Sequence, residues 1–483
     1  MTLVARLERP LPGSLPVGRA TAIFCAGICF HPRERIARLE LAVGDERRPV
    51  PRFGMPRPDV ATYRSGFWVT VPIAARDRPQ ELVLRLIARL QNGGEEVAEL
   101  GRLAIVEPEA EPSAGRLTPT PADAHGPLIA VCMATFEPDI ALFTRQLESL
   151  RAQTDQRWVC VISDDHSTPK RFAQLESALA GDPRFAVSRA PQRLGFYRNF
   201  ERALSLIGPE AKLIALCDQD DRWDSDKLAC LRASLGSAGL VYSDLRLVEA
   251  DGRVLRQTLW RGRSNNQDNL ASMLIANTIT GASMLFRRDL LELALPFPDG
   301  PGIQFHDHWL AAVALTAGEV AYVDRPLYDY VQHPGAVFGD VTHGASGRRA
   351  QHSLRQLSDR WRAAYVYGYL PRELQAQTLL ARCPGAPPAK RRALEWFVDA
   401  DRSAAAFIWL LVRPLRSLLG RTETLSSELE LVRGLLARRL MSLTARLPRR
   451  LAGPFADAGP PPLDAFSQKR LRRWRASLAR ALD

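Results

Sequence analysis

The stretch AKLIALCDQDDRWDSDK, residues 211–227, joins a short apolar run directly to five aspartates. The apolar part has the length and composition of a buried β-strand, so the acidic turn falls at the carboxyl end of that strand. Packing so many carboxylates together is electrostatically costly unless a cation neutralises them. Carboxylate oxygens are ligands that suit Mg²⁺ or Mn²⁺. The stretch therefore predicts a metal site at Asp218 and Asp220, with a solvated acidic turn as the alternative.

Strands and helices alternate on the amino-terminal side of this stretch. Further apolar runs, each followed by an amphipathic segment, lie at 127–136, 158–165 and 185–190. Continuous apolar strands joined by helices imply a parallel sheet that is covered on both faces. Right-handed crossovers then place the carboxyl ends of the strands at one edge, where open α/β sheets bind ligands. We expect a Rossmann-like α/β domain over residues 128–345, with its site at that edge.

Two more polar clusters follow strands of this domain. In ISDDHS, residues 162–167, Asp164 and Asp165 are candidates to accept hydrogen bonds from a nucleobase or ribose. The alternative is a helix N-cap, for which such a turn is well suited. In ATFEPD, residues 134–139, Thr135 and the nearby backbone are candidates to hold a nucleotide. The alternative there is an ordinary turn at the start of a helix.

The segment QFHDHWLAAVALTAG, residues 304–318, predicts an apolar helix that opens with a charged and polar cluster. An aspartate at a helix start commonly caps the helix. A carboxylate can also take a proton from a hydroxyl as the hydroxyl attacks carbon. We therefore interpret Asp307 as a candidate general base, with capping as the alternative. We assign its neighbours His306, His308 and Trp309 to the side of the site that would hold the attacking hydroxyl. For Trp309 the alternative is a position in the core.

The remaining parts of the chain are expected to be accessory. Residues 1–115 hold short alternating apolar and polar runs separated by turn signals, which predicts a small β-sandwich. A linker rich in Pro and Ala is expected at 116–127. Residues 346–450 show the periodicity of helices with basic faces, and a basic tail follows at 451–483. Nothing in residues 1–115 suggests a catalytic group, and we interpret them as a structural or carbohydrate-contacting module.

Charge is concentrated at the carboxyl end of the chain. The formal net charge is +12, and residues 381–483 hold 20 Lys and Arg against 9 Asp and Glu. Nucleic acid, an anionic membrane surface and solvent alone are all compatible with such a region. Its arginines are mixed with Leu, Ala and Trp474, which favours membrane or partner contact over nucleic acid.

Cysteine content and hydropathy bear on the compartment. The number of cysteines is odd, seven, and most lie inside apolar runs, which indicates buried free thiols and a reducing compartment. No apolar run reaches the roughly 18 to 20 residues that a bilayer span needs, and the longest candidate, residues 403–412, is about half that length. We expect a cytoplasmic protein without a signal peptide, attached peripherally to the inner face of the membrane.

The motifs, taken in order, resemble those of the family 2 glycosyltransferases, which have the GT-A fold. The resemblance covers roughly residues 127–340. The forms DQDDRW, HDxW and YVQH are closest to rhamnosyltransferase-like bacterial members that act on surface polysaccharides such as O-antigen. The matching segments are AVCMATFEP, ISDDHS, RLGFYRNFERAL at 193–204, DQDDRWDSDKL, NTITGASMLFRRDLL at 277–291, FHDHWLA, and VDRPLYDYVQHPGAVFG at 323–339.

The resemblance implies roles for individual residues. Asp218 and Asp220 stand where the family's DxD motif binds Mn²⁺ or Mg²⁺ and the donor diphosphate, and His333 falls near the same diphosphate as a further metal ligand. Asp307 stands where the family places its catalytic base. Nucleotide-sugar contacts are implied for Thr135, Glu137, Asp164, Asp165, Asn199, Asp218 and Gly281.

Two positions depart from the family pattern. His306 replaces the acidic residue that usually precedes the base, which leaves the base itself in place. Val331 stands where an arginine is usual before the loop glutamine, and this change removes a phosphate contact.

The implied activity is metal-dependent, inverting transfer of a sugar to a glycan or lipid-linked glycan. The donor would be a dTDP- or UDP-sugar, with rhamnose as the sugar suggested by the motifs, and no nucleic-acid partner is expected. One alternative is a nucleotidyltransferase, which would normally carry a Gly-rich, basic phosphate loop where this chain has ATFEPD. Another is a non-catalytic carbohydrate-binding or scaffold protein with a degenerate site, although Asp220 and Asp307 are both retained.

Overall fold

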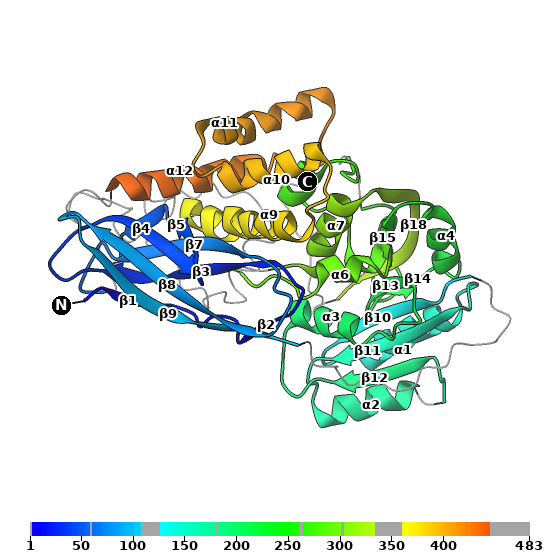
Figure 1. Cartoon of the computed structure of the whole chain (residues 1–483). Coiled ribbons are helices and arrows are strands. Elements are labelled where there is room, and N and C mark those ends of the chain that lie inside the picture. Colours follow the sequence, from blue (N-terminus) through cyan, green and yellow to red (C-terminus); the bar gives the residue numbers. More distant parts are fainter. Residues whose placement is uncertain are drawn as a thin grey trace.

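The computed structural model describes residues 2–57, 60–107, 126–179, 181–259, 264–300, 304–333, 360–424 and 426–444. Within them the chain forms an N-terminal pair of β-sheets, a central α/β domain and a C-terminal group of helices (Figure 1). This is the predicted fold class. The predicted basic tail at 451–483 lies outside the described residues, as does all but the end of the predicted linker at 116–127.

The N-terminal part is a sandwich whose two sheets share one apolar core. Alternating side chains of the long strands, such as Leu84, Leu86 and Leu103, are fully buried between the sheets. The first sheet has the order β1 (Val4–Leu7), β3 (Thr21–Phe30), β7 (Gly66–Ile73), β6 (Arg52–Met55). The second has the order β2 (Ser14–Pro16), β9 (Glu95–Val106), β8 (Gln80–Leu90), β4 (Ile36–Val43), β5 (Glu46–Pro49).

The central domain is built on one mixed sheet. The order is β12 (Phe185–Arg189), β11 (Trp158–Asp164), β10 (Ile129–Thr135), β13 (Leu213–Asp218), β17 (Met284–Arg287), β15 (Leu240–Glu249), β18 (Val320–Gln332), β14 (Arg222–Trp223), with β16 (Val254–Arg256) paired to β15. The first four strands are parallel, as predicted. The sheet is not parallel throughout, because β17 runs antiparallel to both β13 and β15.

Helices of the central domain pack against this sheet and against one another. They are α1 (Ile140–Arg151), α2 (Pro169–Leu179), α3 (Phe196–Ser205), α4 (Lys227–Ser234), α5 (Leu270–Ile275), α6 (Leu290–Ala294) and α7 (His306–Ala317), with a short 3₁₀ turn η1 (Gly281–Ser283) before β17. Helix α7 is apolar on all sides and contacts α3, α5, α6 and α9. A helix of that composition is expected to be buried, and nearly all of its side chains are.

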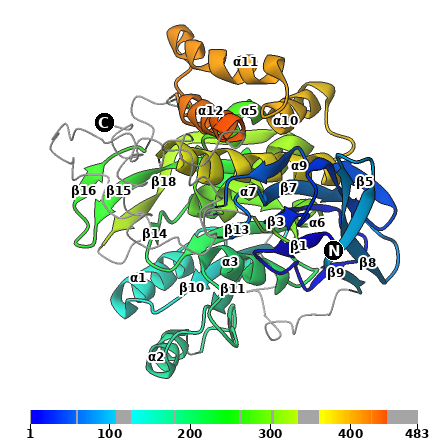
Figure 2. The same cartoon turned by 90° about the vertical axis from the view of Figure 1, so that its left-hand side faces the viewer.

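The C-terminal helices join the other two parts. They are η2 (Ala364–Tyr369), α9 (Leu370–Arg382), α10 (Pro388–Asp399), α11 (Ala404–Val412), η3 (Arg413–Leu419) and α12 (Glu428–Thr444). Helix α9 lies against β3 and β7 of the sandwich, and α11 lies at the outer edge of the molecule in both views (Figures 1 and 2). Arg382 donates from Nε to Ala20 O at 2.7 Å and from Nη1 to Ala294 O at 2.9 Å, so one side chain of α9 bonds to both neighbouring parts.

A cluster of buried charges also links the sandwich to these helices. Arg52 of β6 donates from Nε to Asp401 Oδ2 at 2.5 Å and from Nη2 to Glu373 Oε1 at 3.0 Å. Tyr365 and Arg438 bond to the same Asp401 carboxylate. Arg52 is 321 positions from Glu373 and 349 from Asp401. Charged groups inside a protein are tolerated only when they are paired. The sandwich is therefore part of the same packed body as the helices.

Two other sequence expectations can be compared with the structure. All seven cysteines are free and six of them are buried, as predicted. In the part of the chain that the structure describes, no helix combines the length and the apolar character that crossing a bilayer requires.

Candidate active site

The predicted site lies at the carboxyl edge of the parallel strands. Thr135, Asp164 and Asp218 are the last residues of β10, β11 and β13. Strand pairing places Thr135 opposite Asp164, and Ala134 opposite Asp218, so the three strand ends are adjacent. The residues that the sequence singled out after separate strands therefore meet at one edge, as expected for an open α/β sheet.

Asp218 and Asp307 are close enough for the charge of Asp307 to act on the Asp218 carboxyl. Both side chains are partly exposed although protein surrounds them. The pKa of Asp218 is raised to about 7, mainly by burial and in addition by the nearby charges of Asp220 and Asp307. Burial likewise raises the pKa of Asp307 to about 7, against the opposing effect of backbone N–H donors. The strand-end turn and the start of α7 therefore lie close together, and we call the region beside Asp218 and Asp307 the candidate cleft.

Asp307 sits in the first turn of α7, and His308 N donates to its Oδ1 at 2.6 Å. The N-cap position belongs to Phe305, so capping does not use up the Asp307 carboxylate. Asp307 therefore does not occupy the N-cap position, and its side chain is partly exposed. Its role as a general base remains a prediction.

Asp220 and His333 supply the next pair of groups at this edge. His333 Nε2 lies 2.8 Å from Asp220 Oδ2, and this contact raises the pKa of His333. His333 follows the end of β18, which brings it beside the acidic turn. The structure thus brings His333 beside Asp220, and the role of both residues at a diphosphate remains a prediction.

The carboxylate oxygens at this edge are suitable ligands for Mg²⁺ or Mn²⁺. The described residues form no cluster of three or more His, Cys, Asp or Glu side chains poised around one point. Mg²⁺ and Mn²⁺ do not need such a cage when they are held by one or two carboxylates together with substrate phosphates and water. Burial is the largest cause of the raised pKa of Asp218, and the charges of Asp220 and Asp307 add to it, so a cation bound beside these carboxylates would favour their charged forms.

A buried lysine beneath the acidic turn was not predicted from the sequence. Lys227 Nζ donates to Ala282 O at 2.5 Å and lies 3.5 Å from the centroid of the Trp223 ring. Burial lowers its pKa to about 7, and it counters the charges of Asp218 and Asp221. Lys227 is the last residue of the stretch 211–227. The only signal in the sequence was its position directly after the run of aspartates.

The predicted nucleotide-contacting carboxylates are engaged by protein groups. Asp164 accepts from Thr135 Oγ1 at 3.1 Å and from Ser167 Oγ at 2.6 Å, and it is fully buried. Asp165 accepts from the backbone N–H groups of Leu194 and Gly195. In this structure both carboxylates fix the loops around the strand ends, and their contact with a nucleotide remains a prediction.

Glu137 and Asn199 also brace this edge. Glu137 adopts a left-handed backbone conformation, with φ of 45°, and its Oε1 accepts from Thr168 N at the start of α2. The Asn199 side chain donates to Thr135 O and Ser163 O and accepts from Ser163 Oγ. Both residues lie at the carboxyl edge of the parallel strands, and their polar side-chain atoms bond to other groups of the protein.

The acceptor-side residues are less accessible than predicted. His308 Nε2 contacts Met273 O at 2.7 Å, and Trp309 Nε1 donates to Ala294 O at 2.9 Å, both inside the core. The structure does not bring His308 and Trp309 to the cleft, because α7 is packed on all sides. The His306 ring stacks on Phe200, and burial lowers its pKa to about 3.

Gly281 lies against the same histidine. A Cβ atom at this position would come within 2.7 Å of His306 Nε2. Its backbone N–H also bonds to the Asp307 carboxylate, so this turn approaches the cleft closely. The absence of a side chain is therefore explained by packing at the site edge, and its contact with the donor sugar remains a prediction.

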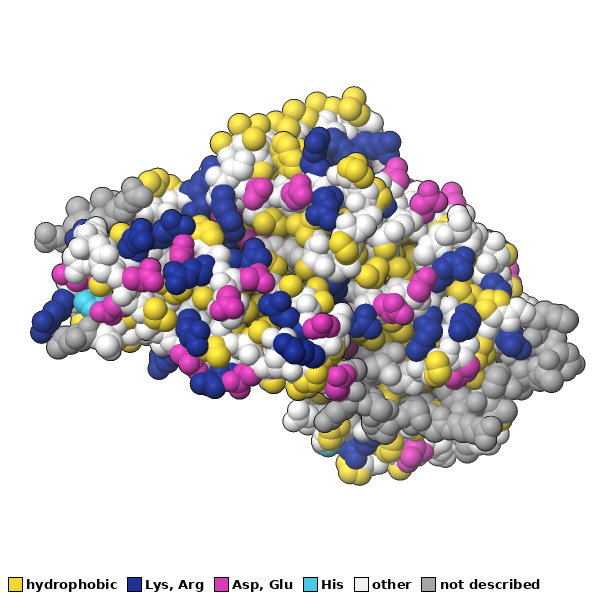
Figure 3. All heavy atoms as spheres, viewed as in Figure 1, with side chains coloured by type: hydrophobic (Ala, Val, Ile, Leu, Met, Phe, Trp, Pro, Cys, Tyr) yellow, Lys and Arg dark blue, Asp and Glu magenta, His cyan; other side chains and the backbone are white. Residues whose placement is uncertain are grey.

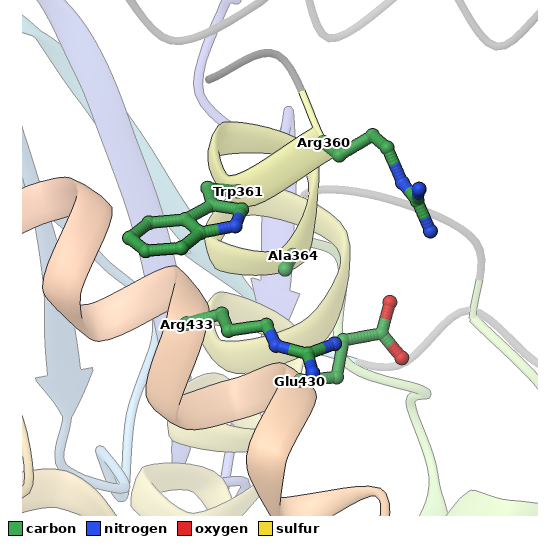
Figure 4. Close-up of a pocket in the computed structure, with 5 residues that line it drawn as sticks. All are labelled: Arg360, Trp361, Ala364, Glu430 and Arg433. Carbon is green, nitrogen blue, oxygen red and sulfur yellow. The ribbon is translucent and has the colours of Figure 1, made fainter. Parts of the chain in front are cut away.

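A separate hollow of about 390 Å³ lies between η2 and α12, lined by Arg360, Trp361, Ala364, Glu430 and Arg433 (Figure 4). None of these lining residues belongs to the strand-end site.

Residues 130–293 match the family model described as glycosyl transferase family 2. This part of the chain is a family 2 glycosyltransferase domain of the GT-A fold. The matched residues include the strand ends and the acidic turn of the glycosyltransferase domain. They end before α7, so the match itself assigns no role to Asp307 or His333.

Several known proteins are similar to parts of this chain. A stretch of 124 residues is 32% identical to the uncharacterized protein y4gI of Sinorhizobium fredii, covering 25% of this chain and only 13% of that protein. S. aureus TarS 1-349 in complex with UDP-GlcNAc is 15% identical, with a TM-score of 0.38, over 66% of this chain and 91% of that chain. Mannosyltransferase PcManGT from Pyrobaculum calidifontis, in complex with GDP-Man and Mn²⁺, is 16% identical, with a TM-score of 0.33, over 69% and 90% of the two chains.

Proposed function

We propose that this chain transfers a sugar from a nucleoside-diphosphate donor to a hydroxyl group of a glycan acceptor, with inversion at the anomeric carbon and with a divalent metal. The observation that supports this most directly is the proximity of Asp218 and Asp307, because the charge of Asp307 acts on Asp218 and both side chains are partly exposed. A site of this kind needs one group that binds the donor diphosphate and one that takes the proton of the acceptor hydroxyl. The family 2 domain provides the first and α7 provides the second.

The residues divide the chemistry between two sides of the cleft. Asp218 and Asp220 would hold Mn²⁺ or Mg²⁺, which when bound supplies positive charge that stabilises the leaving diphosphate. Asp307 would accept the proton of the acceptor hydroxyl as its oxygen attacks the anomeric carbon from the face opposite the diphosphate. One displacement of this kind inverts the configuration. A second carboxylic acid to protonate the leaving group, as in glycosidases, is not needed.

The finer parts of the proposal rest on the sequence resemblance. They are a dTDP- or UDP-sugar as donor, rhamnose as the sugar, and a glycan or lipid-linked glycan of a bacterial surface polysaccharide as acceptor. A location on the inner face of the cytoplasmic membrane belongs to the same set. Turnover separates this proposal from a non-catalytic carbohydrate-binding protein, because release of nucleoside diphosphate from a nucleotide-sugar with Mn²⁺ requires a working site.

Replacing Asp220 with Asn should weaken Mn²⁺-dependent donor binding by about 10- to 100-fold, because one anionic ligand is lost from a site that holds the metal with few protein groups. Calorimetric titration of UDP and dTDP, with and without Mn²⁺, would measure the effect. Asp226→Asn is the matched control, because Asp226 pairs with exposed Arg325 in the same acidic run. Equal losses in both variants would contradict a metal role for Asp220.

The rate of transfer should fall with acid because Asp307 must be deprotonated to act as a base. Its pKa is raised above the usual 3.8 to about 7, so protonation on lowering the pH removes the base earlier than for an ordinary aspartate. A cation bound near Asp218 favours the charged form and lowers the midpoint, which sets about 7 as the upper limit. A profile of kcat/KM against pH with Mn²⁺ would test this. A rate that holds constant down to about pH 4, near the ordinary aspartate pKa, would contradict it.

A further inference from the structure

The outer face of α11 and η3 carries an unusual number of exposed apolar side chains. Leu418 and Leu419 are each 81% exposed and Leu415 is 61% exposed. We call the following set the α11–η3 ridge: Ile408, Leu411, Val412, Leu415, Leu418 and Leu419. Figure 3 shows apolar side chains along the upper edge of the molecule, where Figure 1 places α11.

Helix α11 carries apolar side chains on both its inner and its outer face, so those on the outer face stay exposed. The inner face of α11 buries Ala406 and Leu410, and Trp409 packs against Phe397 and Trp396 of α10 with ring centroids 5.4 Å apart in each case. A helix that only covered the domain would place polar residues on its outer face. Single exposed leucines are common, but a contiguous apolar surface marks a site of interaction.

Positive charge surrounds the ridge. Arg402 and Arg421 are exposed at its two ends, and the Arg439 guanidinium lies 4.2 Å from the centroid of the Phe407 ring. The sequence from Arg402 to Arg421 contains no acidic residue. The exposed acidic residues nearest along the chain belong to α10 and α12 rather than to the ridge.

The two arginines within the ridge segment point inward instead. Arg413 pairs with Glu428 at 3.7 Å, and Arg416 pairs with Glu423 at 2.8 Å. These pairs neutralise the inner arginines and anchor η3 to the helices below. The charge presented outward with the leucines is therefore that of the terminal arginines.

We propose that the α11–η3 ridge docks on the surface of a bilayer that contains anionic lipids. A segment lying in the interface buries its outward apolar side chains between the headgroups, and arginines beside it attract anionic lipids. Charge complementarity is the reason for choosing an anionic surface rather than a second copy of this chain, whose ridge would carry the same positive ends. Residues 404–419 are too few to span a bilayer as a helix, so the segment lies on the membrane.

Vesicle flotation of the full chain tests the proposal. We expect the protein to float with phosphatidylcholine vesicles that contain phosphatidylglycerol and to float poorly with phosphatidylcholine alone. L415Q/L418Q/L419Q should reduce partitioning by at least about tenfold, because binding scales with the buried apolar area. R402Q/R421Q should weaken the preference for the anionic vesicles while it keeps the weaker binding to phosphatidylcholine.

The matched control is V97Q/V106Q/V254Q, which makes the same kind of change at exposed positions outside the ridge. It should float like the wild type. Unchanged flotation of L415Q/L418Q/L419Q would overturn the proposal and assign binding to another part of the chain, such as residues 445–483. Absence of flotation, together with a dimer in sedimentation velocity that the triple variant abolishes, would overturn it in favour of a contact between two copies. Neither readout depends on sugar transfer, so failure here is distinct from failure of the proposed function.

Discussion

Replacing Asp307 with Asn should lower kcat for sugar transfer by about 10²- to 10⁴-fold, which is the usual contribution of a positioned general base. Donor affinity should stay within a few fold of the wild type. The neutral amide cannot take the proton of the acceptor hydroxyl, whereas the donor diphosphate is handled by the separate acidic turn. Loss of the Asp307 charge also removes one of the effects that raise the pKa of Asp218, so it does not weaken the metal side of the cleft.

The substitution separates catalysis from helix capping. Asn accepts backbone hydrogen bonds at a helix start about as well as Asp, so the bond from His308 N can persist in the variant. Steady-state kinetics, donor titration and a thermal melt on the same preparation would give the three quantities needed. A large fall in melting temperature with a proportionate loss of soluble protein would instead favour a structural role for Asp307. Unchanged kcat would remove it from the mechanism.

The position of the candidate site was predictable because strand ends carry local signals. Asp164 and Asp218 each follow a continuous apolar run, and such runs occur in sheets that are buried on both faces. Once the strands are parallel, their carboxyl ends must share an edge, so residues over 50 positions apart are brought together by topology alone. The sequence therefore predicted the acidic edge without any knowledge of side-chain contacts.

Strand direction and side-chain burial were less predictable. Strand β17 has only four residues, too few for a pattern that distinguishes an antiparallel insertion from a loop beside the site. Lys227 resembles a solvated residue when judged by its acidic neighbours, and only the packing of Trp223 and Tyr328 around it shows that it is buried. Trp309 is the opposite case, because its place beside Asp307 suggested the cleft while the turn of the helix directs it into the core.

Contacts between the parts of the chain have no local signal at all. Arg52 and Asp401 are 349 residues apart, and each lies in a segment where a charged residue would ordinarily be placed on the surface. Whether an arginine in a short strand is exposed or buried depends on what packs over the sheet. Here η2, α9 and α12 cover it, which is information that only the three-dimensional structure provides.

Replacing Arg52 with Met should destabilise the protein by about 3–5 kcal/mol, because removing one partner of a buried ion cluster leaves uncompensated charge. Arg52 is almost completely buried and is bonded to both Asp401 and Glu373. Burial acts to raise the pKa of Asp401, but the charges of Arg52 and Arg438 outweigh it and lower that pKa. Without Arg52, Arg438 still pairs with Asp401, but Glu373 loses the guanidinium that bonds to its carboxylate. Thermal melts should show the loss as a large fall in melting temperature.

Arg48→Met is the matched control for this variant. Arg48 also lies on a strand of the sandwich and pairs with Glu46, but both side chains are 46% exposed. Exposed ion pairs contribute about 0–1 kcal/mol, so this variant should melt close to the wild type. A second comparison, R52M/E373Q, removes the orphaned charge together with its partner and should recover part of the lost stability. Equal melting of R52M and the wild type would show that the cluster does not hold the sandwich to the helices. Recovery in R52M/E373Q would show that the unpaired Glu373 carboxylate causes the loss of stability in R52M. The apolar packing of the introduced methionine is the same in the two variants.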